Sequence, residues 1–176
     1  MLNRTNSKSI LLKVITCGEG GVGKTTLLHR YIEGVFLADT RLTIGVEFFL
    51  KEIEVEGKKI LLQIWDFGGQ DHFRPLLKTY AVGARGALLL FDLTRMSSLE
   101  QIDQWINICQ PDDTKIPIML IGTKLDLKEE IMINDDYISY YKDEYNFLEF
   151  LKISSKTGEN VDLVFELLAR ELVKNL

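Results

Sequence analysis

The pattern G-x-x-x-x-G-K-[ST] is met in full by Gly18-Glu19-Gly20-Gly21-Val22-Gly23-Lys24-Thr25, a stretch that we call the phosphate loop. Glycines let a backbone turn tightly and point several N–H donors at one anion. Lys24 adds a mobile positive charge, and Thr25 adds a hydroxyl that can bind Mg²⁺. The stretch therefore predicts a site for the phosphates of a nucleoside triphosphate.

The segments on either side agree with this prediction. An apolar run over residues 11–17 predicts a buried strand before the loop. A helix is predicted after the loop from apolar side chains at helical spacing, namely Leu27, Leu28, Tyr31 and Ile32. The N-terminus of that helix adds partial positive charge to the anion site. A purely structural glycine loop is the alternative, and the strand-loop-helix context disfavours it.

Length and composition are those of one globular domain. A chain of 176 residues can bury a substantial core without disulfide bonds. The formal net charge of -5 argues against a surface that neutralises nucleic-acid phosphates, so we expect no nucleic acid among the partners. Cys17 and Cys109 both lie in apolar patterns, which is typical of buried thiols in a reducing compartment.

The sequence predicts a cytoplasmic protein. No apolar run is long enough to cross a bilayer, and the polar residues 1–9 lack the core of a signal peptide. Leu2 leaves no glycine after Met1 for myristoylation, and residues 171–176 contain no cysteine for prenylation. We therefore expect no lipid anchor in this chain, and any association with membranes to be peripheral, through partners.

The remaining pattern alternates between strands and helices. Residues 33–43 show no sustained period, which predicts a long surface loop. Two strands are predicted over residues 46–55 and 60–65, and the turn over residues 56–58 makes them antiparallel. The second strand ends at Asp66, and an irregular stretch follows over residues 67–75.

Further strands are predicted over residues 86–92, 116–121 and 147–153. A helix is expected to begin at Ser97, which forms a capping-box pattern with Glu100, and to bury Leu99, Ile102, Ile106 and Cys109. Another helix is predicted to start near residue 134, and a closing helix carries the apolar positions Val161, Val164, Phe165, Leu168 and Leu172. This order predicts an α/β protein whose binding site lies at the carboxyl ends of parallel strands.

Five segments fall at predicted strand ends: the phosphate loop, Thr43, residues 66–70, residues 123–126 and residues 154–156. This set resembles the small GTPases of the Ras superfamily, from about Ile10 onward. Residues 43–48 (TIGVEF) are most similar to the Rab branch, residues 65–71 (WDFGGQD) to the Arf branch and residues 122–127 (GTKLDL) to the Rho branch. The resemblance is closest to the Rab branch, with Arf-like and Rho-like motif features, and the subfamily stays open.

The resemblance implies the P-loop small-GTPase fold. That fold has a mostly parallel six-stranded sheet with one antiparallel edge strand and helices on both faces. It also implies a single GTP-binding domain over residues 10–176, preceded by a polar N-terminal tail over residues 1–9. GTP and GDP are then substrate and product, and Mg²⁺ is the cofactor.

The base is predicted to be guanine. A carboxylate such as Asp126 accepts two hydrogen bonds, and guanine offers N1–H and its 2-amino group side by side, whereas adenine offers neither donor there. Lys124 can lay its alkyl stem along the ring, and the resemblance places Phe36 on the base. Thr123 stands where the family usually has Asn, and its hydroxyl can make part of the bridge to the phosphate loop. The resemblance also implies a base contact from the Ser155 backbone N–H, in a loop shaped by Ser154 and Lys156.

For the phosphates, the resemblance implies a binding set of Glu19, Gly20, Gly21, Val22, Gly23, Lys24, Thr25, Thr26 and Gly69. It assigns Thr25 and Thr43 to Mg²⁺ directly and Asp66 to the metal through water. The catalytic set is Gln70, which orients the attacking water, with Lys24 and Thr43 in positional and electrostatic roles. We therefore expect slow intrinsic GTP hydrolysis.

Partners are implied by the same resemblance. An exchange factor, a GTPase-activating protein and effectors are expected to contact residues 36–49 and 66–80 of a monomer. No side chain is assigned as an arginine finger. Arg41, two residues before Thr43, is an internal candidate, and a solvated loop arginine is the ordinary alternative.

Three functions are compatible with the phosphate loop. The first is a GTP-hydrolysing switch, the second a nucleotide-bound scaffold that scarcely hydrolyses, and the third an ATP-dependent kinase. The sequence favours the switch because Gly20, Thr43 and Gln70 are all present. A kinase is disfavoured because no acceptor-site base is recognisable and Asp126 selects guanine.

Overall fold

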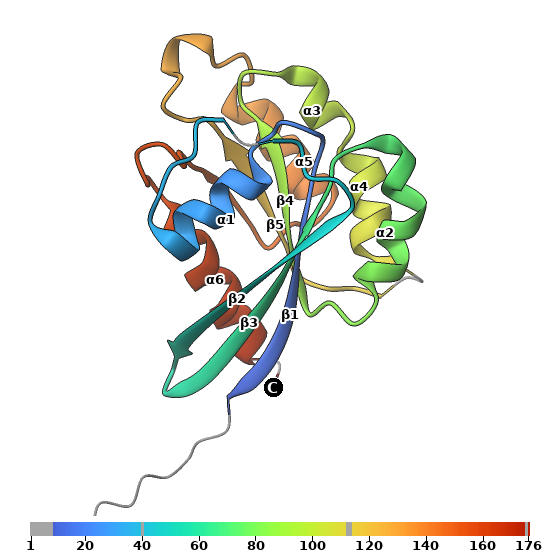
Figure 1. The fold of residues 1–176 in the computed structure, drawn as a ribbon. Helices are drawn as coiled ribbons and strands as arrows, with labels where there is room; N and C mark the ends of the chain where they lie inside the picture. Colours follow the sequence, from blue (N-terminus) through green and yellow to red (C-terminus); the bar gives the residue numbers. More distant parts are fainter. Residues whose placement is uncertain (1–8, 40, 112–113, 175) are drawn as a thin grey trace, which may run out of the picture.

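The computed structural model describes residues 9–39, 41–111, 114–174 and 176. It contains a six-stranded sheet in the order β2-β3-β1-β4-β5-β6 (Figure 1). The strands are β1 Ile10–Cys17, β2 Val46–Val55, β3 Lys58–Phe67, β4 Gly86–Asp92, β5 Ile118–Thr123 and β6 Glu149–Lys152. All neighbouring strands are parallel except β2 and β3. The predicted fold class is thereby confirmed.

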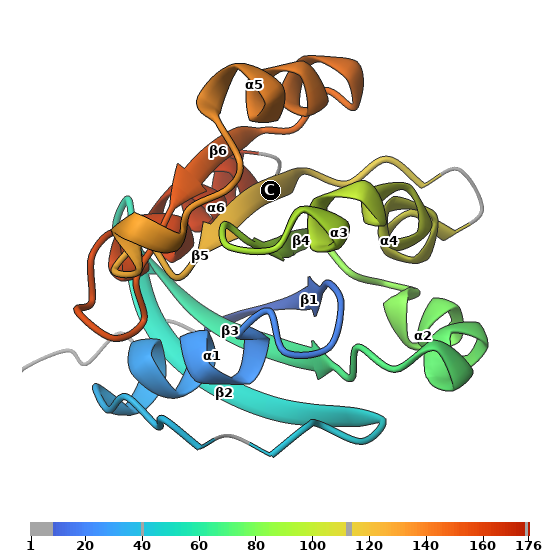
Figure 2. The same cartoon turned by 90° about the horizontal axis from the view of Figure 1, so that it is seen from above.

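Helices cover both faces of this sheet. They are α1 Lys24–Glu33, α2 Arg74–Ala81, α3 Met96–Glu100, α4 Ile102–Cys109, α5 Asp135–Glu144 and α6 Val161–Lys174, with short 3-10 turns η1 Asp71–Phe73 and η3 Lys128–Glu130. Helices α1 and α6 share one apolar cluster with the sheet, and α2 to α5 share the cluster on the other face (Figure 2). All seven residues of β4 are buried, as expected of a strand covered on both sides.

The helix predicted to begin at Ser97 differs from the observed one. The structure has two short helices separated at Gln101, and the first begins at Met96. Ser97 caps nothing, whereas the Ser98 hydroxyl accepts from the Asp92 N–H and donates to the Arg95 carbonyl. The predicted capping box is therefore wrong. Trp105, the largest of the completely buried side chains, belongs to the buried face of α4 and was not predicted, whereas the predicted Ile106 is partly buried against the same cluster.

Edge strand β2 is continuous over its ten residues. Phe49 and Ile53 pack against the core beneath α1 and α6. Phe48 and Leu50 point to the other face and are 55% and 59% exposed, respectively. Side chains alternate along a strand, so an apolar residue on the open side of an edge strand stays in contact with solvent unless something else covers it.

Loops following β1, β3, β5 and β6 meet at the carboxyl edge of the sheet. The loop between α1 and β2 lies beside them, and its described part contains neither helix nor strand, as predicted. After β3, by contrast, residues predicted as irregular form η1 and the start of α2. Of the tail expected over residues 1–9, residues 1–8 lie outside the described residues. Among the described helices, none has the length and hydropathy to span a membrane.

Candidate functional site

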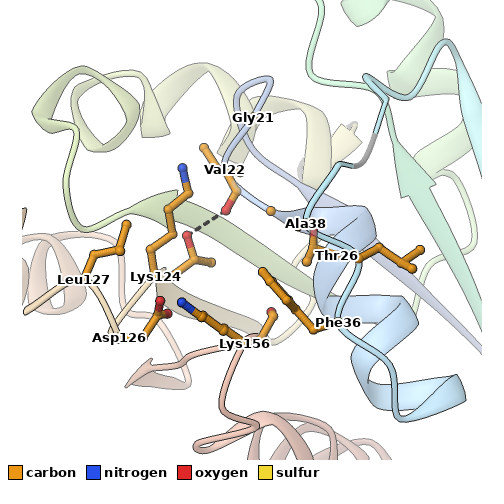
Figure 3. A pocket seen from close by; sticks show the side chains of 13 residues that line it. Gly21, Val22, Thr26, Phe36, Ala38, Lys124, Asp126, Leu127 and Lys156 are labelled. Atoms are coloured by element: carbon orange, nitrogen blue, oxygen red, sulfur yellow. Dashed lines mark hydrogen bonds between the residues drawn. The ribbon is translucent and has the colours of Figure 1, made fainter.

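Two adjoining pockets open at the carboxyl edge of the sheet. The larger one has a volume of about 330 Å³ (Figure 3) and the smaller one about 60 Å³. Gly21, Gly23 and Thr26 line both, so the phosphate loop forms their common wall. The larger pocket is completed by residues 36–38 and by residues of the loops after β5 and β6. The smaller pocket is completed by residues 41–43 and Gly69.

The phosphate loop is shaped by glycines and closed by Lys24. Gly18 has φ 139°, and a Cβ there would lie 2.3 Å from the Leu90 carbonyl oxygen, so only glycine fits. The Lys24 Nζ donates to the carbonyls of Gly18 at 2.6 Å and Glu19 at 2.9 Å. Burial lowers the pKa of Lys24 to about 8, against the opposing charge of Asp66. Helix α1 begins at Lys24, so its N-terminus faces the pockets.

Three side-chain oxygens predicted to serve Mg²⁺ converge beside Lys24. Thr25 Oγ1 donates to Asp66 Oδ2 at 2.5 Å and lies 2.6 Å from Thr43 Oγ1. Asp66 is completely buried, and desolvation raises the pKa of its carboxyl despite hydrogen bonds from Thr25 and Thr16. Thr16, on β1, donates to the other carboxylate oxygen at 2.7 Å. Hydroxyl and carboxylate oxygens are ligands that Mg²⁺ prefers, so the donor set fits the ion.

The larger pocket brings together the residues expected to hold a base. Figure 3 shows Phe36, Lys124 and Lys156 around the cavity, with Asp126 beside them. Ser154 Oγ donates to Asp126 Oδ1 at 2.7 Å and so fixes the carboxylate. Lys124 has φ 64°, and its Nζ lies 2.5 Å from the Asp92 carboxylate. Burial raises the pKa of the Asp92 carboxyl, but the hydrogen bonds from Lys124 and Thr94 outweigh it and hold this pKa below its usual value.

Thr123 bridges the loop after β5 to the phosphate loop. Its Oγ1 lies 2.6 Å from the Val22 carbonyl oxygen and 3.0 Å from that of Phe91 (the first contact is dashed in Figure 3). A hydroxyl has one proton, so it donates to one carbonyl at a time, and the shorter distance favours Val22. The bridge expected from the usual Asn is therefore present in part.

Not every predicted residue lines a pocket. Glu19, Asp66, Ser154 and Gln70 are not among the residues that line either pocket, and Gln70 is a half-buried residue immediately before η1. Gly69 lines the smaller pocket and packs tightly against the phosphate loop, because a Cβ at this position would lie 2.2 Å from the Gly20 nitrogen.

Arg41, the internal arginine candidate, lines the same smaller pocket and is exposed.

Sequence reasoning missed several contributors. Leu37, Ala38 and Leu127 line the larger pocket, and Leu42 lines the smaller one. Arg95 contacts the phosphate loop from the loop after β4, where its Nη2 donates to the Gly20 carbonyl at 2.9 Å. The position of Asp92 at the end of an apolar run was a signal for a site residue, but nothing in the local pattern marks Arg95.

Fold and pockets define a P-loop protein of the Ras-like GTPase class. The model of the Ras family matches residues 13–174. Curated relatives include the Ras-related protein Rab-19 of Xenopus laevis, 36% identical over 93% of this chain and 77% of the relative. The Ras-related protein Rab-8B of Dictyostelium discoideum is 38% identical over 99% and 86%, and the GTP-binding protein ypt2 of Schizosaccharomyces pombe is 39% identical over 97% and 85%.

The chain therefore belongs to the Ras family, and its relatives put it close to the Rab branch. Membership makes it a small GTPase, a GTP hydrolase that acts as a molecular switch. The motifs similar to the Arf and Rho branches are local features of a Rab-like protein.

Proposed function

We propose that this GTPase binds GTP and GDP together with one Mg²⁺, hydrolyses GTP slowly, and presents two loops to partners according to the bound nucleotide. The observation that carries the proposal is the convergence of Thr25, Thr43 and Asp66 beside Lys24, next to a pocket that contains a carboxylate for the base. Residues 10–176 act in it as a single GTP-binding domain. Mass analysis of the nucleotide that co-purifies with the protein, followed over time, tests it directly.

The larger pocket selects guanine. Asp126 is fixed by Ser154 and lies in the pocket with Phe36 and Lys124 on its walls. A carboxylate there accepts from guanine N1–H and the 2-amino group, and a second contact comes from the backbone N–H of Ser155. An adenine base in the same place presents no donor pair and leaves the carboxylate unpaired, which costs binding energy.

Asp126→Asn should weaken GTP binding and favour xanthosine triphosphate. The 2-oxo group of xanthine accepts a hydrogen bond at the place where the 2-amino group of guanine donates one. The loss of a charged hydrogen-bond pair predicts weakening of GTP binding by about 10- to 100-fold. Competition between mant-GTP and each unlabelled triphosphate measures the change. Unaltered preference for GTP in the variant would remove Asp126 from base recognition.

The phosphates are held by the loop backbone and Lys24. Binding moves the Lys24 ammonium from the carbonyls of Gly18 and Glu19 toward the β- and γ-phosphates. Thr25 and Thr43 would hold Mg²⁺ directly, and Asp66 would hold it through water. The ion, when bound, supplies positive charge that neutralises the phosphate oxygens.

Hydrolysis depends on Gln70, whose amide both donates and accepts hydrogen bonds and so orients the attacking water in line with the γ-phosphate. The γ-phosphate also holds Thr43 through the metal site and Gly69 through its backbone N–H. Its loss frees both loops, which is how the switch reports its state.

Gln70→Leu should leave GTP binding intact and suppress turnover, because the side chain keeps its bulk and loses both polar groups. We expect single-turnover hydrolysis to fall at least about tenfold, with Kd for mant-GTP within about twofold of wild type. Unchanged single-turnover hydrolysis would exclude Gln70 from the mechanism.

Partner contacts are proposed at residues 36–49 and 66–80. Exposed apolar side chains gather there: Phe48 on β2 is 55% exposed and lies in edge contact with Trp65, which neighbours Tyr80 on α2. Such a patch on a protein surface is typical of a protein-binding site. Effectors, an exchange factor and a GTPase-activating protein would bind these segments. The protein would be a cytoplasmic monomer, and its partners would bring it to membranes.

A further inference from the structure

Arg95 connects two loops that are distant in the sequence. It lies between β4 and α3, and its Nη2 donates to the Gly20 carbonyl of the phosphate loop at 2.9 Å. The same nitrogen lies 3.5 Å from the Glu19 carboxylate. One guanidinium thus contacts two consecutive residues of the phosphate loop.

This contact differs from an ordinary surface ion pair. Only 39% of the Arg95 side chain and 23% of the Glu19 side chain are exposed. Glu19 Oε2 and Arg95 Nε are buried and have no hydrogen-bond partner among the described residues. Exposed ion pairs contribute little because water screens them, but this pair is partly shielded, and removal of Arg95 would leave the buried Glu19 Oε2 without the charge that faces it.

The backbone turn that carries Arg95 is itself held in place by hydrogen bonds. Asp92 Oδ1 accepts from both the backbone N–H and the hydroxyl of Thr94, at 2.9 and 2.7 Å. The Ser98 hydroxyl donates to the Arg95 carbonyl at 2.7 Å. The guanidinium therefore projects from a turn held by side-chain hydrogen bonds and contacts the phosphate loop from there.

On the other side, the restrained segment belongs to the smaller pocket. The Glu19 carbonyl accepts from the Lys24 Nζ at 2.9 Å, while its carboxylate pairs with Arg95. Gly20 lines that pocket and lies against Gly69. Arg95 also acts on Lys24 electrically, because its positive charge contributes to the lowered pKa of that ammonium.

We propose that Arg95 is a positioning residue of the nucleotide site: it fixes the Gly20 carbonyl and the Glu19 side chain of the phosphate loop and thereby slows release of bound guanine nucleotide. The inference rests on the proposed function, since it requires the phosphates to lie on this loop. Arg95 acts through Gly20 and Glu19, not on the reacting atoms.

The test is the rate of mant-GDP release from Mg²⁺-loaded protein. Arg95→Ala should speed release about 5- to 20-fold, because it removes a charge-assisted hydrogen bond and leaves Glu19 unpaired. Arg95→Lys should recover part of the loss, since an ammonium can still donate to the Gly20 carbonyl. Glu19→Gln should have a smaller effect because the bond to Gly20 survives.

Arg170→Ala is the matched control. Arg170 pairs with Glu166 at 2.6 Å on the exposed side of α6, and this variant should release mant-GDP at the wild-type rate. The ³¹P resonance of the β-phosphate of bound GDP supplies a second readout. It should shift in Arg95→Ala and stay in place in Arg170→Ala.

Several results would overturn the inference. If the Arg95→Ala variant releases mant-GDP at the wild-type rate, the inference is overturned and the proposed function is unaffected. Faster release with an unshifted ³¹P resonance and a lowered Tm would show a general loss of stability in place of positioning. Wild-type protein that binds no mant-GDP would overturn the proposed function, and this inference with it.

Discussion

At the scale of single residues, Thr123 shows how a change of side chain alters a site without removing it. The family's usual Asn has an amide with two donor hydrogens, whereas Thr123 has one hydroxyl proton, directed to the Val22 carbonyl at 2.6 Å. Thr123 is 3% exposed, so no water is at hand to replace that bond. The hydroxyl therefore matters for both stability and the position of the phosphate loop.

Thr123→Val keeps the shape of the side chain and removes the hydroxyl. The Val22 carbonyl then loses a buried hydrogen-bond donor, which costs about 1–3 kcal/mol. For a chain of this size that loss lowers Tm by about 2–12 °C, which a thermal melt measures. Thr114→Val is the control, because Thr114 is exposed and the same substitution there should change Tm little. Equal melting of Thr123→Val and wild type would contradict the assigned bond.

At the scale of elements, three loops pack backbone against backbone at the smaller pocket. A Cβ on Gly69 would lie 2.2 Å from the Gly20 nitrogen, and one on Gly68 would lie 2.6 Å from the Thr43 carbonyl oxygen. Neither Gly68 nor Gly69 has a positive φ, so lack of space and not backbone conformation requires glycine. The backbone of the loop after β3 thus packs directly against the phosphate loop and against the loop before β2.

Gly69→Ala should force the loop after β3 away from Gly20, because the neighbouring atoms are backbone and cannot move aside cheaply. The strands are unaffected, so the protein still folds and binds GDP. We expect the gain in Tm of the GTPγS-loaded form over the GDP-loaded form to disappear, since Gly69 no longer reaches the γ-phosphate. If the variant keeps the wild-type difference in Tm between the GTPγS-loaded and GDP-loaded forms, Gly69 does not contact the γ-phosphate.

At the scale of the whole molecule, the sheet assembles the site. Parallel strands β3, β1, β4 and β5 end at one edge, and the loops that follow them come from residues far apart in the chain. The pockets therefore exist only in the folded state. A ligand that binds there stabilises the folded chain by mass action.

GDP with Mg²⁺ should raise Tm, whereas ADP with Mg²⁺ should not. At about a thousand times Kd, binding adds about 4 kcal/mol, which corresponds to about 8–16 °C for a domain of this size. Chelation of the metal with EDTA should reduce the increase, because the phosphates lose their counter-charge. Differential scanning fluorimetry measures all three conditions, and equal stabilisation by ADP would contradict base selection at Asp126.

Local patterns predicted most of the fold because they depend on neighbouring residues alone. The strand before the glycine loop, the helix α1 after it and the buried β4 were predicted correctly from glycine spacing and apolar runs. The break at Gln101 was missed, because the apolar spacing continues across it and gives no sign of an interruption. The strand pattern over residues 46–55 also left open which side of β2 faces solvent, and only the packed structure shows that Phe48 and Leu50 are exposed.

By itself, the sequence determined that the chain has a phosphate loop, a carboxylate at residue 126 and the motifs of a small GTPase, because each is a short pattern of side chains. Tertiary structure alone decided that Arg95 holds Gly20 and that Thr123 reaches Val22. Those contacts join residues 75 and 101 positions apart, and their existence depends on the angle at which whole loops leave the sheet. No local pattern encodes that angle, because packing of the complete core sets it.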